Sequence, residues 1–174
     1  MKLKIFSVLV LCLLLAGLST AQEIAFEQKV RLIETFDEGQ DVMDPYASPQ
    51  LAAQDKQRAV LLTTYIIVNK GGKYELENSF KLSEVDWISF NCQVLSLVKT
   101  KAKIHLFLLG PGSGVSIYPG EENKFKKNSL YEVSFTLEGS TPLKTGTYKA
   151  FVILELQQKG SAVGAREEMT FRIY

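Results

Sequence analysis

The sequence predicts an all-β fold, an antiparallel β-sandwich with an N-terminal extension packed on it. Three observations support this class. Short segments in which apolar and polar residues alternate recur from about residue 80 to the end of the chain. Glycine, proline and small polar residues separate these segments, as turns require. No helix-length apolar pattern lies between them, which disfavours strand–helix–strand units and a parallel sheet.

The individual strands follow from these alternations. Residues 58–69 are rich in β-branched and aromatic side chains, and the two glycines within Lys70–Lys73 favour a hairpin turn after them. Residues 87–97 change the parity of their apolar positions midway, which predicts a β-bulge. Residues 119–128 and 160–166 are interpreted as a polar loop and a turn. The other strands are expected at residues 74–82, 101–109, 115–118, 131–137, 147–156 and 169–173.

The N-terminal half of the chain is less regular. Residues 22–57 are interpreted as an extension and linker, and residues 58–174 as the sandwich domain, which is most regular over residues 80–174. Apolar side chains in residues 23–36 fall at helical spacing, although some of them also alternate as in an edge strand. We expect a short amphipathic helix there, with an edge strand as the alternative.

Residues 1–21 are expected to be a secretory signal peptide. Two lysines near the start precede an apolar run over residues 5–18, and residues 19–21 are small, as a signal peptidase requires. The run is shorter than the ~18–20 apolar residues of a membrane span, so cleavage is favoured over a membrane anchor. Cys12 lies inside the run and not at its end, which disfavours a lipid anchor. The sequence therefore predicts export to the periplasm or the extracellular space, without membrane insertion after cleavage.

The charge balance excludes some partners. The chain has 20 Lys and Arg against 19 Asp and Glu, and cleavage after residue 21 would leave 18 against 19. This balance gives no electrostatic reason to bind nucleic acid or an acidic membrane surface. Cys92 would be the one remaining cysteine, so no internal disulfide is expected. Its apolar surroundings in the sequence predict a buried thiol.

A short segment near the C-terminus carries a fold-level resemblance. Leu143-Lys-Thr-Gly-Thr-Tyr148-Lys-Ala-Phe-Val152 resembles the turn and penultimate strand of immunoglobulin-like and fibronectin-like sandwiches. The resemblance implies such a sandwich, with the Tyr148 side chain bonded back to the backbone of the corner. The inter-sheet cysteine pair of antibody-type domains is absent. The resemblance implies no function, because unrelated sandwiches share this feature.

Two expected strands are apolar on both faces. Phe107 and Leu109 lie at one parity of their strand, opposite its other apolar residues, and Phe151 and Ile153 do the same in theirs. The outer face of a sandwich sheet normally meets water, so these side chains need a cover. The protein's own residues 23–82 are the favoured cover. A second copy of the chain or another protein is the alternative.

No motif in the sequence carries chemistry. His105 is the single histidine and sits at the polar parity of a strand, where a solvated residue is the favoured interpretation over a catalytic one. Gly110–Gly114 lacks the residues of a phosphate loop, and residues 37–41 lack calcium-loop spacing. One histidine and one mature cysteine are too few for a structural zinc site. We expect no enzyme activity, no cofactor, no metal and no small-molecule ligand.

Residues 110–128 are the segment most similar to a binding loop. Tyr118 and Phe125 are candidate contact residues for a protein partner, with Lys124, Lys126 and Lys127 around them. The favoured alternative is a plain connection whose aromatic side chains pack into the edge of the domain.

The functional expectation is an exported, non-enzymatic sandwich that binds or scaffolds another protein in the periplasm or cell envelope. A structural subunit of an envelope or extracellular assembly is the alternative. A secreted enzyme inhibitor or an enzyme is less favoured, because the sequence alone cannot place two carboxylates together in space.

Overall fold

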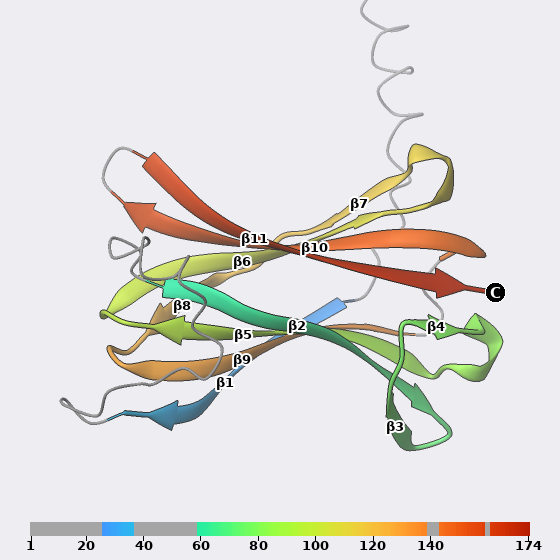
Figure 1. Cartoon of the computed structure of the whole chain (residues 1–174), viewed down its shortest axis with the longest axis horizontal. Coiled ribbons are helices and arrows are strands. Elements are labelled where there is room, and N and C mark those ends of the chain that lie inside the picture. The colour runs from blue at the N-terminus through green and yellow to red at the C-terminus, as the bar shows by residue number, and fades with distance from the viewer. Residues whose placement is uncertain (1–25, 37–58, 139–142, 159–160) are drawn as a thin grey trace, which may run out of the picture.

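The computed structural model describes residues 26–36, 59–138, 143–158 and 161–174, which form two packed β-sheets (Figure 1). The expected signal peptide and most of the expected linker lie outside these residues. The predicted all-β sandwich, with almost entirely antiparallel pairing, is confirmed. Apart from strands, the described chain contains two short 3-10 helices at Leu82–Glu84 and Pro111–Ser113.

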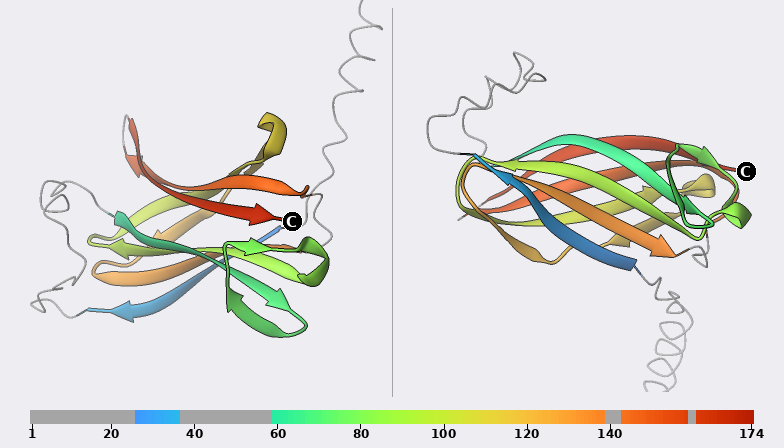
Figure 2. Two further views of the ribbon diagram at one scale, coloured as in Figure 1. Left: turned by 45° about the vertical axis from the view of Figure 1, so that its right-hand side comes forward. Right: turned by 90° about the horizontal axis from the view of Figure 1, so that it is seen from below.

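The first sheet has five strands in the order β1-β9-β5-β2-β3, and its neighbours all run antiparallel. It is the lower layer in Figure 1, and the right view of Figure 2 looks onto its outer face. Two strands that are far apart in the sequence, β1 and β9, are therefore neighbours in this sheet. Its members are β1 (Phe26–Thr35), β2 (Ala59–Lys70), β3 (Lys73–Leu76), β5 (Trp87–Ser96) and β9 (Ser129–Glu138).

The second sheet follows the order β4-β11-β10-β6-β7. A further strand, β8, pairs with β6 beyond the end of β7, so that one long strand holds two short ones. The short pairing of β4 with β11 is parallel. The members are β4 (Ser79–Phe80), β6 (Thr100–Leu109), β7 (Val115–Tyr118), β8 (Glu122–Phe125), β10 (Gly146–Gln158) and β11 (Ser161–Ile173).

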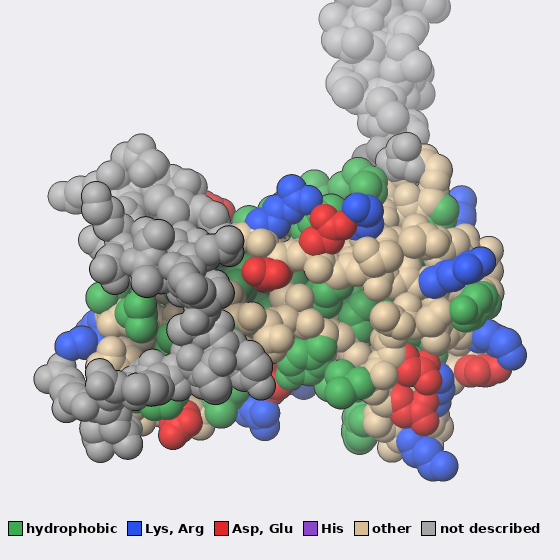
Figure 3. All heavy atoms as spheres, in the orientation of Figure 1, with side chains coloured by type: hydrophobic (Ala, Val, Ile, Leu, Met, Phe, Trp, Pro, Cys, Tyr) green, Lys and Arg blue, Asp and Glu red, His purple; other side chains and the backbone are tan. Residues whose placement is uncertain are grey.

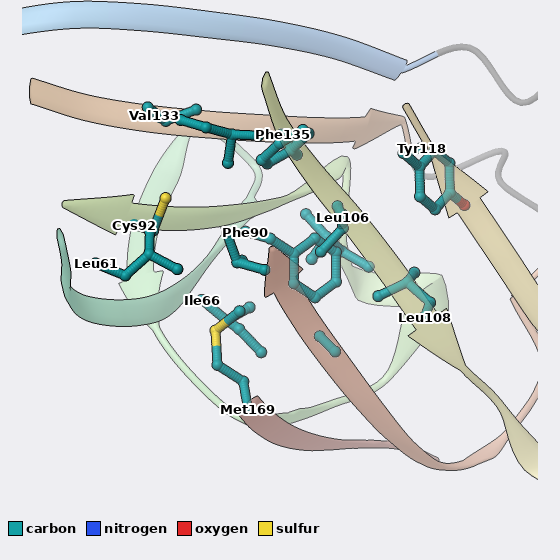
Figure 4. Packing of buried hydrophobic residues seen from close by; sticks show 14 of the residues in the cluster. Leu61, Ile66, Phe90, Cys92, Leu106, Leu108, Tyr118, Val133, Phe135 and Met169 are labelled. Carbon is teal, nitrogen blue, oxygen red and sulfur yellow. The ribbon is translucent and has the colours of Figure 1, made fainter. Parts of the chain in front are cut away.

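The core lies between the inner faces of the two sheets. Phe90 and Phe135 come from the first sheet, Leu106 and Val152 from the second, and all four are fully buried. Figure 4 shows the close packing of these layers, with Cys92 among the aliphatic side chains. Each strand contributes every second residue, because successive side chains of a strand point to opposite faces. Burying large aliphatic and aromatic side chains contributes roughly 1.5–3 kcal/mol each.

The predicted hairpin turn after β2 is confirmed. Gly71 and Gly72 both have positive φ, 58° and 83°, which side chains with a Cβ rarely adopt. The Gly72 N–H donates to Oδ1 of Asn69 at 2.9 Å, and the Gly71 N–H donates to Oδ2 of Asp86 at 2.9 Å. The turn thereby fixes the register of β3 against β2.

The prediction of a helix over residues 23–36 is wrong. Residues 26–35 form β1, which pairs with β9 along its whole length. Phe26 and Val30 pack on the core, whereas Leu32 and Ile33 remain exposed. A long-range partner strand therefore outweighs the local helical spacing, which a sequence cannot reveal. The sandwich itself begins before residue 58, because this segment is one of its edge strands.

Three smaller expectations also differ from the structure. The predicted bulge is present in β2 and not in β5: two residues between Leu61 and Thr64 oppose Gln93 alone, while β5 pairs with β9 without interruption. The expected loop at residues 119–128 contains β8, and the expected turn at residues 160–166 belongs mostly to β11. In each case pairing with another strand decides the outcome.

The expected bond of Tyr148 to the corner is confirmed. The Tyr148 hydroxyl donates to the Lys144 carbonyl at 3.0 Å and accepts from the Lys144 N–H at 2.8 Å. Its ring is buried and stacks on Phe171 at 5.0 Å between centroids. The bond ties the turn before β10 to the core.

Replacing Tyr148 by phenylalanine tests the contribution of this corner. Tyr148→Phe keeps the buried ring and leaves a backbone donor and acceptor without their partner, so we expect a loss of about 1–2 kcal/mol in the free energy of unfolding. Urea titration followed by circular dichroism measures it. Tyr174→Phe is the matched control, because the Tyr174 hydroxyl accepts an exposed bond from Ser79 Oγ at 2.7 Å. Equal losses in the two variants would contradict the assigned role of the corner.

Candidate binding surfaces

The candidate contact residues of segment 110–128 divide into two groups. Tyr118 and Phe125 are 2% and 1% exposed and are therefore not available as surface contacts. Their rings make edge contacts inside the domain, Tyr118 with Phe26 at 5.2 Å and Phe125 with Tyr131 at 4.8 Å. The pairing of β7 and β8 with β6 turns these aromatic side chains inward, as the plain-connection alternative expected. By contrast, the three lysines, Lys124, Lys126 and Lys127, are exposed.

The corner between β7 and β8 is fastened to both sheets. A Cβ on Gly120 would lie 1.7 Å from the Ile104 carbonyl oxygen, so only glycine fits this approach. Gln28 of β1 donates from Nε2 to the same carbonyl at 3.3 Å and accepts from the Glu121 N–H at 3.0 Å. One side chain of the first sheet thereby holds the corner of the second. The corner between β7 and β8 is therefore an ordered part of the sandwich, held by contacts to both sheets.

His105 has structural partners on the outer side of the second sheet. Its Nδ1 accepts the Gly120 N–H at 3.1 Å, and its Nε2 lies 2.9 Å from Oε2 of Glu155. Acceptance at Nδ1 places the ring proton on Nε2, from where it donates to the carboxylate. Cys92 lies on the inner face of the other sheet, so the structure does not bring these two residues together.

One thiol and one hydroxyl group of the first sheet, those of Cys92 and Tyr65, have strongly raised pKa values. Burial raises the pKa of the Cys92 thiol from 9.0 to about 12, and the nearby Glu132 carboxylate adds to the shift. The pKa of Tyr65 rises from 10.0 to about 12, first because of burial and then because its hydroxyl donates to Glu132. Both groups are therefore protonated at neutral pH, and the Cys92 thiol is not a nucleophile there.

The outer face of the second sheet is apolar, as its sequence predicted. Phe107 of β6 lies opposite Phe151 of β10 and opposite Ile117 of β7. Phe107, Phe151 and Ile153 are half-buried, while Ile117 is 59% exposed. Phe107, Phe151 and Ile153 line a shallow hollow of about 250 Å³, and Ile117 lies beside it on β7. We call this surface the apolar face: Phe107, Leu109, Val115, Ile117, Phe151 and Ile153.

The described part of the N-terminal half does not cover the apolar face. β1, β2 and β3 all belong to the opposite sheet, and β4 pairs at the far edge of the second sheet. The expectation that residues 23–82 form the cover is therefore wrong for the residues described. Those strands instead supply the inner face that buries the core. Figure 3 shows hydrophobic side chains beside charged ones along the top of the molecule, over the second sheet.

The outer face of the first sheet is polar, and the sequence reasoning singled out none of its residues. Ser89 and Asn91 of β5 and Ser134 of β9 line a groove of about 760 Å³, with Trp87 and Tyr74 at one end. The sequence does indicate this polar face, because polar residues alternate with Ile88, Phe90 and Cys92. Small polar residues at the outward parity are nevertheless the ordinary state of a solvated sheet, so the pattern alone could not reveal a groove.

The described residues form neither a metal centre nor a membrane-spanning helix. No group of three or more His, Cys, Asp or Glu side chains is placed to hold a metal ion there. No helix in that part of the chain is long and apolar enough to cross a membrane.

Comparisons with known proteins support the fold. No protein-family model matches the sequence, and no curated protein shows significant similarity to it. The structure resembles the crystal structure of the C-terminal domain of Wzt with a TM-score of 0.53 and 10% sequence identity, over 68% of this chain and 75% of that one. At this identity the likeness establishes a shared β-sandwich and nothing finer.

Other solved structures match with TM-scores below 0.5. Pseudomonas fluorescens alkylpurine DNA glycosylase AlkC bound to DNA gives 0.46 at 7% identity, over 72% of this chain and 33% of that one. AggA, the major subunit of aggregative adherence fimbriae type I from Escherichia coli, gives 0.35 at 13% identity, over 67% and 95%. Likenesses this weak do not bear on function.

The raised pKa values of Cys92 and Tyr65 predict a loss of stability in alkali. The unfolded chain releases these protons at lower pH than the folded chain, so stability is full below about pH 9 and falls between about pH 9 and pH 12. Urea unfolding midpoints at a series of pH values measure the decline. Cys92→Val removes one of the two groups, and its decline should be shallower. A wild-type midpoint that stays constant from pH 8 to pH 11 would contradict the assignment.

Proposed function

We propose that this protein is an exported, non-enzymatic β-sandwich that binds another protein through its apolar face. The observation that carries the proposal is the outward placement of Phe107 and Phe151 on adjacent strands, with no described segment over them. Full burial of a large apolar side chain contributes roughly 1.5–3 kcal/mol, and a partner would gain the part of it that these half-buried rings still leave in water. A contiguous set of them on a monomer is typical of an interaction surface.

The size and rim of the apolar face favour a protein over a small molecule. Its hollow of about 250 Å³ is below the range of about 300–1,000 Å³ that is usual for small-ligand sites. Arg166 lies 4.1 Å from the Phe151 ring centroid and 3.6 Å from Glu168 Oε2. Lys149 pairs with the same carboxylate at 2.7 Å. An apolar centre with a charged rim is the usual composition of a protein interface.

The partner that fits this surface is a protein with an exposed apolar patch and charges of both signs around it. Arg166 stacked on Phe151 offers a ready contact, because arginine and aromatic residues dominate the energetics of many interfaces. The site of action that we propose is the periplasm or cell envelope. Support for export comes from the charged start and apolar run of residues 1–21.

A second copy of the chain is the other candidate partner. The rim pairs Lys149 with Glu168 and places Arg166 beside them, so both signs lie close together on one face. A surface that carries both signs can complement itself across a two-fold axis. Such pairing would make the protein a structural subunit of an assembly.

A charge introduced on the apolar face tests the proposal. Ile117→Glu places a carboxylate on the apolar face beside Phe107, and the substitution leaves the core intact because Ile117 is 59% exposed. We expect wild-type protein to enrich a partner from the envelope fraction that the variant does not retain. The purified partner should then bind the wild type at least tenfold more tightly than the variant, measured by calorimetry. Light scattering reports whether that partner is a second copy.

The matched control is Leu76→Glu, which introduces the same charge at a residue that is 73% exposed on β3 of the other sheet. This control should bind the partner as the wild type does. Equal binding by wild type, Ile117→Glu and Leu76→Glu would refute the apolar face as the contact. A strictly monomeric protein that retains nothing from the envelope fraction would refute the proposal as a whole.

A further inference from the structure

We propose that the groove on the outer face of the first sheet binds a neutral saccharide chain. The groove lies on the side of the sandwich opposite the apolar face, so this inference stands apart from the function proposed above. It also departs from the expectation that the protein has no small-molecule ligand. The right view of Figure 2 looks onto the sheet that carries it. Its volume of about 760 Å³ falls within the usual range of ligand sites.

The floor of the groove is made of small polar side chains. Ser89 lies opposite Thr136 in the register, and Asn91 lies opposite Ser134, so the four sit together on the two neighbouring strands β5 and β9. Ser89 and Asn91 are each only 4% exposed, because longer side chains surround them. The groove therefore forms because the side chains of its floor are shorter than those around it.

These floor residues are held in place by one another. Ser89 Oγ lies 3.2 Å from Oδ1 of Asn91, and Asn91 Nδ2 donates to the Ser89 carbonyl at 3.0 Å. Thr136 Oγ1 approaches Ser89 Oγ at 3.5 Å. An amide carries two donor hydrogens and a hydroxyl oxygen two lone pairs, so Asn91 retains one N–H and the hydroxyls retain acceptor capacity for a ligand. Ordered groups of this kind suit the hydroxyls of a sugar.

One end of the groove carries a pair of aromatic rings. Tyr74 of β3 lies 5.4 Å from Trp87 of β5 between ring centroids, with an angle of 48° between the planes. The Tyr74 side chain is 70% exposed, so its ring is open to a ligand. In Figure 1 the β2–β3 hairpin bends down at this end of the lower sheet. Aromatic faces contact C–H groups favourably, and one side of a pyranose ring is rich in them.

The carboxylates of the groove are positioned by neighbouring groups. Glu132 accepts from the Tyr65 hydroxyl and from Arg31 Nη2, the latter at 2.6 Å. Glu27 pairs with Lys29 at 2.9 Å on β1. Charged acceptors held in one geometry form strong hydrogen bonds with hydroxyl donors. A sugar supplies such donors, and it brings no charge that must be neutralised.

The charge of the lining disfavours anionic ligands. Glu27, Asp86, Glu132 and Glu138 contribute four carboxylates to the groove, against the single ammonium of Lys29. A nucleic acid could stack on the rings, but its phosphates would meet this acidic surface. Sulfated and uronic-acid polysaccharides are disfavoured for the same reason. The ligand that fits this site is therefore a saccharide chain with many hydroxyl groups and no negative charge.

An extended peptide fits the groove less well. A peptide gains affinity either by pairing with an open strand edge or by placing apolar side chains in pockets. The floor strands β5 and β9 are both paired on each side, so their backbone groups are already bonded. Among the described lining residues, Ile67 is the only aliphatic one. The site therefore offers a peptide few of the contacts that it needs.

Calorimetry with a panel of soluble polysaccharides tests the proposal. The neutral members are dextran, laminarin, galactomannan and chitohexaose, and dextran sulfate is the anionic match of dextran. We expect at least one neutral member to bind and dextran sulfate to bind no more tightly than dextran. Tyr74→Ala should lower the affinity about tenfold, which corresponds to the loss of one aromatic contact. Ser134→Tyr should abolish binding by filling the floor.

The matched control is Tyr174→Ala, which removes an exposed aromatic ring from the C-terminal end of the other sheet. It should bind the saccharide as the wild type does, and so should Ile117→Glu. Absence of binding to every neutral member at millimolar concentration would overturn the proposal. Preference for dextran sulfate, or equal binding by Tyr74→Ala and wild type, would overturn it too. A protein ligand that binds here, and is lost in Tyr74→Ala while no saccharide binds, would also refute it.

Discussion

The burial of one face of each sheet against the other is the constraint on which the rest of the structure depends. Ile88 and Val133 in the first sheet and Ile104 and Leu154 in the second have no exposed surface. A slip of one residue in any pairing would turn these side chains to solvent, because side chains alternate along a strand. The register that buries the core therefore also decides which residues face outward. Both candidate surfaces are consequences of the same packing.

The two sheets are also joined at their margins by polar contacts. Gln28 of β1 bonds both the Ile104 carbonyl and the Glu121 N–H, which connects an edge strand of one sheet to the corner of the other. Gly120 permits this approach by having no side chain. Such contacts supply side-chain partners to backbone groups at the margin of the sandwich. They fix the corner that follows β7, whose pairing with β6 places Val115 and Ile117 on the apolar face.

The sequence predicts the parts of this protein that local pattern controls. The alternation at residues 131–137 gives β9, and the two glycines after Lys70 give the hairpin. Local pattern could not decide between helix and strand for β1, because Val30 fits a helical spacing and a strand alternation alike. Pairing with β9 makes this segment a strand. Phe151 was predictable as an outward apolar residue from parity, whereas Ser89 and Asn91 look like ordinary solvated residues until the register places them together.

The two outer faces are chemically independent because parity assigns each strand residue to one side. Phe151 and Ile153 point away from the core on β10, while Val152 and Leu154 between them point inward. The same holds for Ser89 and Asn91 on β5, separated by the fully buried Phe90. A substitution on one outer face therefore leaves the other face, and the core between them, unchanged to first order. A domain built in this way can contact a protein with one sheet while its other sheet remains open to a second ligand.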